Sequence, residues 1–328
     1  MKEDVISILK ENNGSYVSGQ YLSIRLNVSR TAIWKYIKSL KESGYIIESS
    51  SKKGYRIISS PDLLTSDEIK PHLITKYLGH EIIHFDTLDS TNNKAKEIAS
   101  KVRANGTVIT SEEQVSGKGR LGRQWVSPKY KGIWMSYILR PHIEPIHVPK
   151  ITHIAAAAVV AGLNKLNINA FIKWPNDIIV NGKKICGILT EMSGEINCID
   201  YVVVGIGINA NLETIDIPTD IIDKASSLLI ETGKLIERKI LAAEVINSFE
   251  ELYEKFLNSG SIKDSIEICR KNSILLGKEI RIINRQHEET AIAADISDEG
   301  ELIAEFSDGT KRKIISGEVS IRGLKGYI

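Results

Sequence analysis

Cysteine is scarce in this chain of 328 residues, which has three: Cys186, Cys198 and Cys269. Their number is odd and their spacing matches no pattern of metal ligands, so the sequence excludes a disulfide framework and a cysteine-based zinc site. Free thiols are typical of a reducing compartment. We therefore expect a cytoplasmic protein whose cysteines carry no chemistry.

Long apolar runs are missing as well. Residues 1–11 lack the run of about seven apolar residues that a signal peptide needs. The longest run, residues 154–163, is far shorter than the ~20 residues that cross a bilayer, so we expect a buried helix there and no membrane contact. A composition of 42% hydrophobic and 26% charged residues is that of an ordinary globular protein. The length favours two or three domains, because single cores stop growing at about 250 residues.

The charge is distributed unevenly along the chain. Residues 1–60 hold ten Lys and Arg against five acidic residues, a balance of +5, which leaves −3 for the rest of a chain whose net charge is +2. A basic N-terminal module on a mildly acidic body indicates a polyanionic partner for the module alone.

Residues 1–60 have the pattern of a winged helix-turn-helix. A first helix ends at the signal Asn12-Asn13-Gly14, a second lies near residues 18–26, and Ser29 is placed to cap a third helix that ends at Gly44. Two strands, 45–48 and 54–57, flank a basic tip at residues 49–53. The inner faces of the first and third helices are apolar: Val5, Ile6, Ile8, Leu9, Ala32, Ile33, Ile37 and Leu40.

The outer side of the third helix suits contact with DNA, and the basic tip suits contact with its backbone. The side chains that we expect to bind DNA are Ser29, Arg30, Thr31, Trp34, Lys35, Lys38, Lys52 and Lys53. A small helical protein-interaction domain with a solvated basic face is the alternative interpretation. We place the end of this domain at residue 62, where Ser60-Pro61-Asp62 breaks the pattern, and expect a short helix to follow with Ser66 as its cap.

Residues 63–272 alternate strand and helix patterns and predict a central α/β domain. The predicted strands are 82–85, 107–112, 133–138, 170–173, 177–180, 184–191 and 201–208, and the predicted helices are 92–102, 151–166 and 238–256. Several strands follow one another without a helix, and Asn181-Gly182 predicts a hairpin. A mixed or antiparallel sheet is therefore expected.

Residues 117–125 alternate three glycines with three cations and end in Trp125. Backbone N–H groups and guanidinium groups could close around an anion here, and the indole would offer a flat face to a purine. We expect this loop to be mobile until the anion binds. Because the Walker A pattern is absent, phosphate binding of the P-loop kind is excluded. By residue chemistry alone, a solvated basic hairpin or a nucleic-acid contact is equally possible.

Two strand patterns point to a ligand site. Period-two spacing would put Lys184 on one face with Cys186, Ile188 and Thr190, a cation at the edge of an apolar wall that suits a ligand with an anionic end. An edge-strand lysine that prevents aggregation explains the same pattern. In residues 202–209, two glycines indicate close approach of the backbone to a ligand or another strand. A dinucleotide fold is disfavoured, since its third glycine is missing.

Residues 273–328 read as short strands, 279–283, 289–296, 302–306 and 311–315, joined by turns at 298–300 and 308–309. This pattern predicts a small C-terminal barrel of the SH3-like kind. Its role is open between a stabilising cap and a surface that helps to hold a ligand or partner.

Five motifs in register resemble bacterial biotin–protein ligases: 89–92, 113–114 with the 117–125 loop, 173–177, Lys184 with 187–189, and 205–209. The resemblance covers essentially the whole chain and, with the winged helix, matches the bifunctional type that is also the biotin operon repressor. It implies a central domain of the class II synthetase kind and an SH3-like end. Lys118 stands where the family often has arginine, and Leu121 where a second arginine can occur. Lysine lacks the bidentate fork of arginine, so closure of the loop around the adenylate would be weaker here.

The resemblance implies a reaction in two steps. Biotin and Mg-ATP give biotinyl-adenylate and diphosphate, and a lysine of a biotin carboxyl carrier protein, such as that of acetyl-CoA carboxylase, then takes the biotin and releases AMP. The adenylate would also promote a homodimer that binds operator DNA. Two alternatives remain: a small-molecule-sensing regulator without catalysis, and a ligase of the lipoate kind.

The resemblance also assigns roles to residues. For catalysis it implies Arg120, Lys173, Asp177 and Lys184, with Asp177 also near Mg²⁺. For biotin it implies Ser90, Thr91, Asn92, Gln114, Lys118, Gly119, Arg120, Lys184, Gly187 and Leu189. For the nucleotide it implies Arg120, Arg123, Trp125, Asn176 and Asn209.

Overall fold

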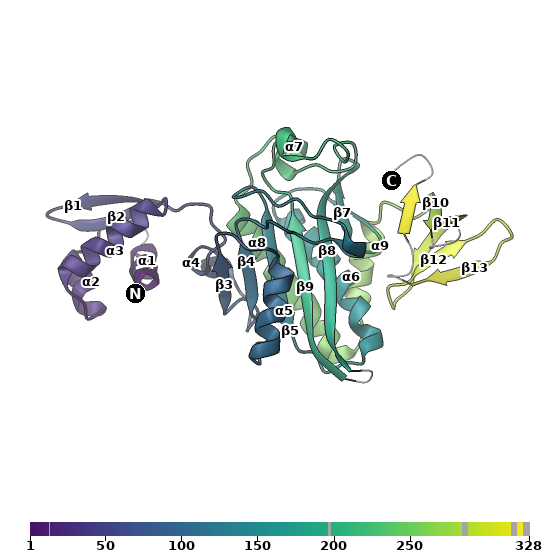
Figure 1. Cartoon of the computed structure of the whole chain (residues 1–328), viewed down its shortest axis with the longest axis horizontal. Coiled ribbons are helices and arrows are strands. Elements are labelled where there is room, and N and C mark those ends of the chain that lie inside the picture. Colours follow the sequence, from purple (N-terminus) through teal and green to yellow (C-terminus); the bar gives the residue numbers. More distant parts are fainter. Residues whose placement is uncertain (13, 196–197, 284–287, 316–319, 324–328) are drawn as a thin grey trace. The chain divides into compact units, whose positions relative to one another are not determined.

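The computed structural model describes residues 1–12, 14–195, 198–283, 288–315 and 320–323 (Figure 1). The chain divides into two compact units, Met1–Leu63 and Leu64–Ile328. Each unit has a hydrophobic core of its own.

The first unit is a helix-turn-helix followed by a hairpin, as predicted. Its elements are α1 (Lys2–Glu11), α2 (Gly19–Arg25), α3 (Arg30–Glu42), β1 (Ile46–Ser50) and β2 (Gly54–Ser59). The predicted cap of the third helix is confirmed, because the Ser29 side chain accepts the N–H of Ala32 at 3.1 Å. Asn12 ends α1, and Asn13 of the predicted stop signal lies outside the described residues.

The predicted inner faces of α1 and α3 meet in one core. Val5 and Leu9 of α1 pack with Ile33 and Leu40 of α3, and all four are fully buried. Ala32, also predicted for this core, is only half-buried. The apolar periodicity of the sequence therefore places both helices correctly.

The second unit is built on a seven-stranded sheet in the order β3-β4-β5-β9-β8-β7-β6. β3 and β4 run parallel and the other neighbours run antiparallel, so the predicted mixed sheet is confirmed. The strands are β3 (Ile82–Phe85), β4 (Val108–Ser111), β5 (Ile133–Leu139), β6 (Phe171–Lys173), β7 (Asp177–Val180), β8 (Lys183–Glu195) and β9 (Cys198–Ile208).

Helices cover both faces of this sheet (Figure 1). α5 (Thr91–Lys101) packs Ala95 and Ala99 on one face, while α6 (Val148–Lys165) and α8 (Arg238–Ser259) cover the other. Within the described chain, Pro145–Lys165 alone is long and apolar enough to cross a membrane, but 72% of its apolar window is buried inside the protein. The apolar run of the sequence is thus the buried helix that we predicted.

Three short helices complete the second unit: α4 (Ser66–Ile69), α7 (Leu228–Thr232) and α9 (Lys263–Lys271). α4 was predicted, but Ser66 as its cap is wrong. Ser66 is already the first helical residue, and Thr65 stands at the cap position without a side-chain hydrogen bond. α7 and α9 were not predicted.

The register of the β7–β8 hairpin corrects one prediction. Ile178 pairs with Cys186, but the next pair joins Ile179 to Lys184, so one extra residue bulges from β8. A bulge reverses the alternation of faces on one side of it. Lys184 therefore does not share a face with Cys186, Ile188 and Thr190, as period-two spacing suggested.

The side chains confirm this reversal. A Cβ built on Gly187 would lie 3.3 Å from Lys184 Cε, so these two residues share one face. Cys186 is fully buried in the main core, and Thr190 bonds Thr152 of α6 at 2.8 Å on the opposite side. The bulge thus brings the lysine to the face of the sheet that carries Gly187.

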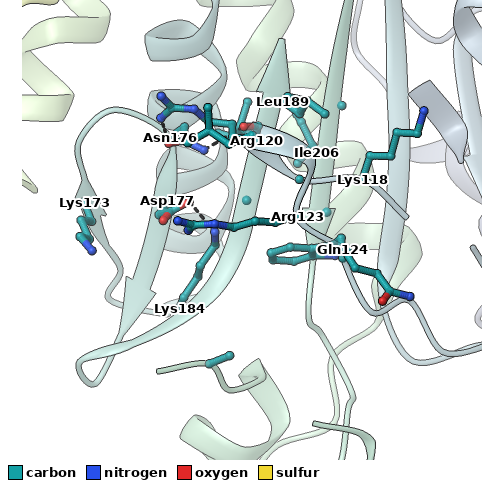
Figure 2. Close-up of a pocket in the computed structure, with 18 of the residues that line it drawn as sticks. Lys118, Arg120, Arg123, Gln124, Lys173, Asn176, Asp177, Lys184, Leu189 and Ile206 are labelled. Atoms are coloured by element: carbon teal, nitrogen blue, oxygen red, sulfur yellow. Dashed lines mark hydrogen bonds and ion pairs between the residues drawn. The ribbon is translucent and has the colours of Figure 1, made fainter. Parts of the chain in front are cut away.

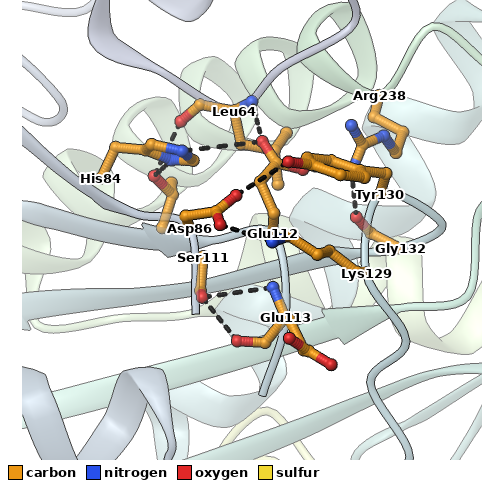
Figure 3. Close-up of polar contacts among 11 residues, drawn as sticks. Leu64, His84, Asp86, Ser111, Glu112, Glu113, Lys129, Tyr130, Gly132 and Arg238 are labelled. Carbon is orange, nitrogen blue, oxygen red and sulfur yellow. Dashed lines mark hydrogen bonds and ion pairs between the residues drawn. The ribbon is translucent and has the colours of Figure 1, made fainter. Parts of the chain in front are cut away.

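A buried ion pair ties the start of the second unit to the sheet (Figure 3). Glu112 accepts a hydrogen bond from Arg238 of α8 at 2.8 Å and another from the N–H of Leu64 at 2.8 Å. Arg238 also donates to the carbonyl of Gly132, just before β5, at 3.0 Å. Both charged side chains are inaccessible to solvent, so each carboxylate oxygen of Glu112 depends on these partners.

The C-terminal end forms a five-stranded antiparallel sheet in the order β13-β12-β11-β10-β14. Its strands are β10 (Glu279–Ile283), β11 (Glu288–Ile296), β12 (Leu302–Glu305), β13 (Lys311–Ile314) and β14 (Ser320–Gly323). The four predicted strands are confirmed, and β14 was not predicted. Residues 284–287, 316–319 and 324–328 of the predicted barrel lie outside the described residues.

His153 of α6 lies under this sheet and makes stability sensitive to acid. Burial lowers its pKa to about 4, against an ordinary value near 6.5. The unfolded chain therefore binds the proton more readily than the folded chain, and stability is lost as the pH falls from about 6.5 toward 4. Between pH 7 and pH 5 this loss amounts to about 2 kcal/mol.

The His153→Leu variant should lack this component. Urea unfolding at pH 7 and pH 5 should show a pH dependence smaller by about 2 kcal/mol than that of the wild type. His80→Leu, at an exposed histidine, is the control and should keep the wild-type pH dependence. Equal pH dependence in all three proteins would refute the assignment.

Candidate functional site

A cavity of about 610 Å³ lies in the second unit, on the face of the large sheet that α5 covers. Strands β7, β8 and β9, the start of α5, the 117–125 loop and residues 221–225 form its walls. Arg281 and Ile321 reach it from the C-terminal sheet. The volume suits a ligand of several hundred daltons.

One end of the cavity is formed mainly by neutral polar side chains. Ser90, Thr91 and Asn92 are buried there, and Gln114 lies beside them. The Gln114 carboxamide oxygen accepts from the Thr91 N–H at 2.8 Å and from its hydroxyl at 3.1 Å. The four residues that the sequence assigned to one head group are therefore brought together.

Two serines that the sequence reasoning missed complete this end. Ser136 of β5 donates to Asn92 at 2.6 Å or to Thr91 at 2.7 Å, and Ser127 accepts from Gln114 at 2.8 Å. The signal for Ser136 was one small hydroxyl side chain among the large, mostly apolar residues of a strand that is buried throughout. Such a network orients its members for a ligand with several neutral donors and acceptors.

The glycines of β9 make room for two side chains. A Cβ on Gly205 would lie 2.0 Å from Asn92 Oδ1, and one on Gly207 would lie 2.7 Å from Trp125 Nε1. The sequence predicted a close approach by a ligand or a strand at these glycines. The close approach is instead made by side chains, which lie flat against the strand because it has no Cβ there.

Replacing Gly205 by alanine should therefore weaken binding at the neutral end. The new methyl group would push Asn92 from its bonds to Ser136 and to Glu191, the latter 2.8 Å long. We expect ligand affinity at this end to fall by about 10- to 100-fold, the loss of one or two buried hydrogen bonds. Titration calorimetry measures this, with Gly260→Ala as control, because Gly260 lies outside the cavity lining and a Cβ there would meet no atom within 4 Å. Unchanged affinity in Gly205→Ala would contradict the arrangement.

The other end of the cavity is strongly cationic (Figure 2). Asp177 is the one carboxylate among the described residues of the lining. Seven basic side chains line the same cavity: Lys118, Arg120, Arg123, Lys173, Lys184, Lys224 and Arg281. The excess of positive charge fits a ligand with several negative charges. Lys224 and Arg281 were not predicted.

Two contacts hold the central cations. Arg120 Nη1 donates to Asn176 Oδ1 at 2.7 Å, and Lys184 Nζ lies 2.6 Å from Asp177 Oδ1. The Lys184 ammonium also lies 5.1 Å from the ring centroid of Trp125. Desolvation lowers the pKa of Arg120, although Asp177 opposes this shift. Asn176 and Asp177 thus aim two cations into the same space.

The 117–125 loop is a short hairpin in this structure. Gly119 N–H donates to Arg123 O at 2.7 Å, and Trp125 N–H donates to Gly117 O at 2.8 Å. At its tip Leu121 is exposed and adopts a left-handed backbone with φ of 57°, a conformation that non-glycine residues rarely hold. A tip with so few contacts fits the expectation of a loop that changes shape on binding, which stays a prediction.

The remaining predicted site residues are placed as follows. Gly119, Gly187 and Leu189 line the cavity, and Lys173 lies on the far side of it from Lys118, which bonds Asn93 at 2.9 Å (Figure 2). Asn209 does not line the cavity. Its amide donates to Ser226 O at 2.9 Å, and its Oδ1 is buried without a hydrogen-bond partner.

The first unit carries a second concave surface. A hollow of about 680 Å³ lies between α3, the start of α2 and the β1–β2 hairpin. Four of the predicted DNA contacts line it: Arg30, Trp34, Lys38 and Lys52. The other four, Ser29, Thr31, Lys35 and Lys53, are exposed outside it. Lys41, which was not predicted, adds a cation to its lining.

Comparison with known proteins covers all parts of the chain. Family models match residues 2–56 (HTH domain), 84–209 (Biotin/lipoate A/B protein ligase family) and 275–322 (Biotin protein ligase C terminal domain). The Bifunctional ligase/repressor BirA of Bacillus subtilis is 36% identical over 98% of both chains, and that of Escherichia coli is 27% identical over 95% of both.

A solved structure of biotin protein ligase from Aquifex aeolicus, in complex with biotin and ATP, is also similar. It is 30% identical to this chain and superimposes with a TM-score of 0.65. The match covers 74% of this chain and 99% of that one.

Proposed function

Because the chain belongs to the biotin–protein ligase family, in its bifunctional ligase/repressor type, we propose how its two concave surfaces perform ligation and repression. The cavity of the second unit activates biotin with ATP and transfers it to a carrier lysine. The first unit binds operator DNA.

One observation carries the ligase assignment: a single cavity joins a neutral hydrogen-bonding end to a cationic end. The ureido ring of biotin is neutral and has donors and acceptors that Ser90, Thr91, Asn92 and Gln114 can match. Its carboxylate is joined to the ring by an apolar chain, which places the negative charge toward the cations. ATP brings the further negative charges that seven basic side chains can neutralise.

In the first step, a carboxylate oxygen of biotin attacks the α-phosphorus of ATP and diphosphate leaves. Both reactants are anions, so their approach is unfavourable unless cations lie between them. Lys184 and Arg120 supply these cations, while Lys118 and Gly119 close over the biotin tail. Catalysis then consists of positioning and charge stabilisation, and no side chain forms a bond to the substrate.

In the second step, the amine of a carrier lysine attacks the acyl carbon of the mixed anhydride. The amine loses a proton, the bond to AMP breaks, and an amide forms. Asp177 is the carboxylate of the described cavity lining that can orient the incoming amine, and Lys173 lies near the same end. Arg123, Trp125 and Asn176 are assigned to the nucleotide, with Trp125 covering adenine. The nucleotide role of Asn209 requires its side chain to turn from Ser226.

Magnesium fits this site as a partner of the nucleotide. Mg²⁺ in such sites is held by one or two carboxylates together with substrate phosphates. Asp177 is the one carboxylate in the described lining, and the described part of the chain holds no cluster of three His, Cys, Asp or Glu that could form a protein cage. The ion would supply further charge neutralisation at the phosphates.

Incubation with ATP, a labelled acid and an acceptor domain tests the ligase proposal. We expect labelled biotin, and not labelled lipoate, to enter the acceptor, because lipoate lacks the ureido donors and acceptors that the neutral end matches. Transfer of lipoate alone would indicate a lipoate ligase. No adenylate in either case would indicate a sensor without catalysis.

We further propose that the protein acts in the cytoplasm, on a biotin carboxyl carrier protein such as that of acetyl-CoA carboxylase, and that the adenylate promotes a homodimer. The hollow beside α3 then receives DNA. Lys38→Ala and Lys52→Ala should each weaken operator binding and reduce its salt dependence by about one counterion. Lys278→Ala, at an exposed lysine of the other unit, should change neither. A salt dependence unaltered by both hollow variants would refute this surface.

A further inference from the structure

The turn at residues 298–300 of the C-terminal sheet reaches the wall of the ligand cavity. The carbonyl of Gly300 accepts a hydrogen bond from the indole N–H of Trp174 at 2.9 Å. This bond is buried, and Trp174 is only 2% exposed. Trp174 itself lines the cavity, between β6 and β7. A backbone atom of the small domain thus fixes a side chain of the ligand site.

The turn is held against the large unit on its other side as well. Glu299 forms an ion pair with the nearly buried Lys150 of α6, and Asp298 accepts from Arg270 of α9 at 2.8 Å. Gly300 has a left-handed backbone with φ of 91°, and a Cβ there would lie 2.4 Å from the ring of His153. The turn therefore fits its place without a side chain at Gly300.

Trp174 begins the segment that holds the central cations. Two residues along, Asn176 accepts from Arg120 at 2.7 Å, and its neighbour Asp177 lies 2.6 Å from the Lys184 ammonium. A movement of the indole would be passed along three covalently joined residues to both contacts. Displacements near 1 Å at such groups can cost about 100-fold in rate.

We infer that Gly300 and Trp174 are positioning residues for adenylate formation. The turn at 298–300 fixes the indole, and the indole fixes the side chains that aim Arg120 and Lys184. This inference rests on the proposed ligase function. It assigns the C-terminal sheet a part in the chemistry of the first step, beyond the Arg281 and Ile321 contacts to the cavity.

Two glycines of the small domain form a matched pair for the test. Gly300 and Gly309 both lie in turns with positive φ, 91° and 80°, but the space around Gly309 is open. Alanine at either position costs the same kind of backbone strain, and only Gly300→Ala pushes on His153. We expect Gly300→Ala to lower the rate of biotin-dependent ATP–diphosphate exchange per active site by about 10- to 100-fold. Gly309→Ala should stay within about twofold of the wild type.

Two tryptophans provide a second pair of variants, which tests the positioning role of Trp174 even if Gly300→Ala does not fold. Trp174→Phe removes the N–H donor and keeps an aromatic ring. Trp134→Phe makes the same change at a buried indole whose N–H has no hydrogen-bond partner. We expect a loss of about tenfold in the exchange rate per site for Trp174→Phe and less than about twofold for Trp134→Phe.

The readouts separate positioning from simple stabilisation. Active sites are counted by the adenylate retained per chain, so unfolded protein lowers the count and leaves the rate per site unchanged. The KM for biotin should stay within about twofold of wild type in Trp174→Phe, because the neutral end lies on α5 and β5. A Trp174→Phe rate per site equal to that of Trp134→Phe would overturn the inference. Failure of the wild type to form adenylate would instead refute the ligase proposal.

Discussion

Replacing Lys184 by glutamine lowers the rate of adenylate formation by about 100- to 1000-fold, the usual loss for a group that stabilises charge in a transition state. The ammonium of Lys184 lies on the cavity side of β8, 2.6 Å from Asp177. In the proposed first step, this ammonium lies between the biotin carboxylate and the α-phosphate and offsets the repulsion between these two anions. Glutamine keeps much of the length and polarity of lysine but removes the charge.

The neighbouring Lys183 is a close control for this prediction. It lies on the same strand and donates to the backbone carbonyl of Ile222 at 3.2 Å, and it does not line the cavity. Lys183→Gln should keep at least half of the wild-type rate. ATP–diphosphate exchange measures both variants. A Lys184→Gln rate within tenfold of that of Lys183→Gln would contradict the role of the cation.

Breaking the buried pair of Glu112 and Arg238 destabilises the second unit by about 3–5 kcal/mol, because it leaves one charge buried without its partner. In Arg238→Met, the Glu112 carboxylate keeps the N–H of Leu64 but loses its cation. The carbonyl of Gly132 loses a donor in the same variant (Figure 3). Urea unfolding, followed by fluorescence, measures the loss.

Two further variants serve as a control and as a rescue for this prediction. Arg312→Met breaks an exposed pair with Glu289, 3.4 Å long, and should cost less than about 1 kcal/mol. Glu112→Gln added to Arg238→Met should recover part of the lost stability, because the neutral amide no longer buries an uncompensated charge. Equal free energies of unfolding for Arg238→Met and Arg312→Met would show that the buried pair contributes no more to stability than the exposed pair.

Periodicity and turn residues predicted most of the elements. The helices α1, α3, α6 and α8 have long apolar faces, and their positions were predicted to within a few residues. The helix α7 spans little more than one turn, too short to show a helical period, and the strand β14 has a single apolar side chain, Ile321, so both were missed. The helix α9, nine residues long, was also missed. It lies in the segment that joins the large sheet to the C-terminal sheet.

The sequence was less informative about how side chains meet. A bulge of one residue in β8 leaves no mark in the hydrophobic pattern, so Lys184 was assigned to the wrong face, although it does line the cavity. Arg281 and Gly300 were missed for another reason. They lie more than 95 residues along the chain from Lys184, and only the packing of the two sheets brings them to the cavity wall.

The affinities of Arg120→Ala for biotin and for a stable analogue of biotinyl-adenylate test the role of the cationic end most directly. Arg120 lies in the cavity against Asn176, and we expect it to bind the phosphate of the adenylate. Titration calorimetry should show affinity for the analogue reduced about 100-fold, the cost of removing one partner of a buried charge pair, with a much smaller change for biotin. Equal changes for the two ligands, or none, would contradict the binding of an acyl phosphate by these cations.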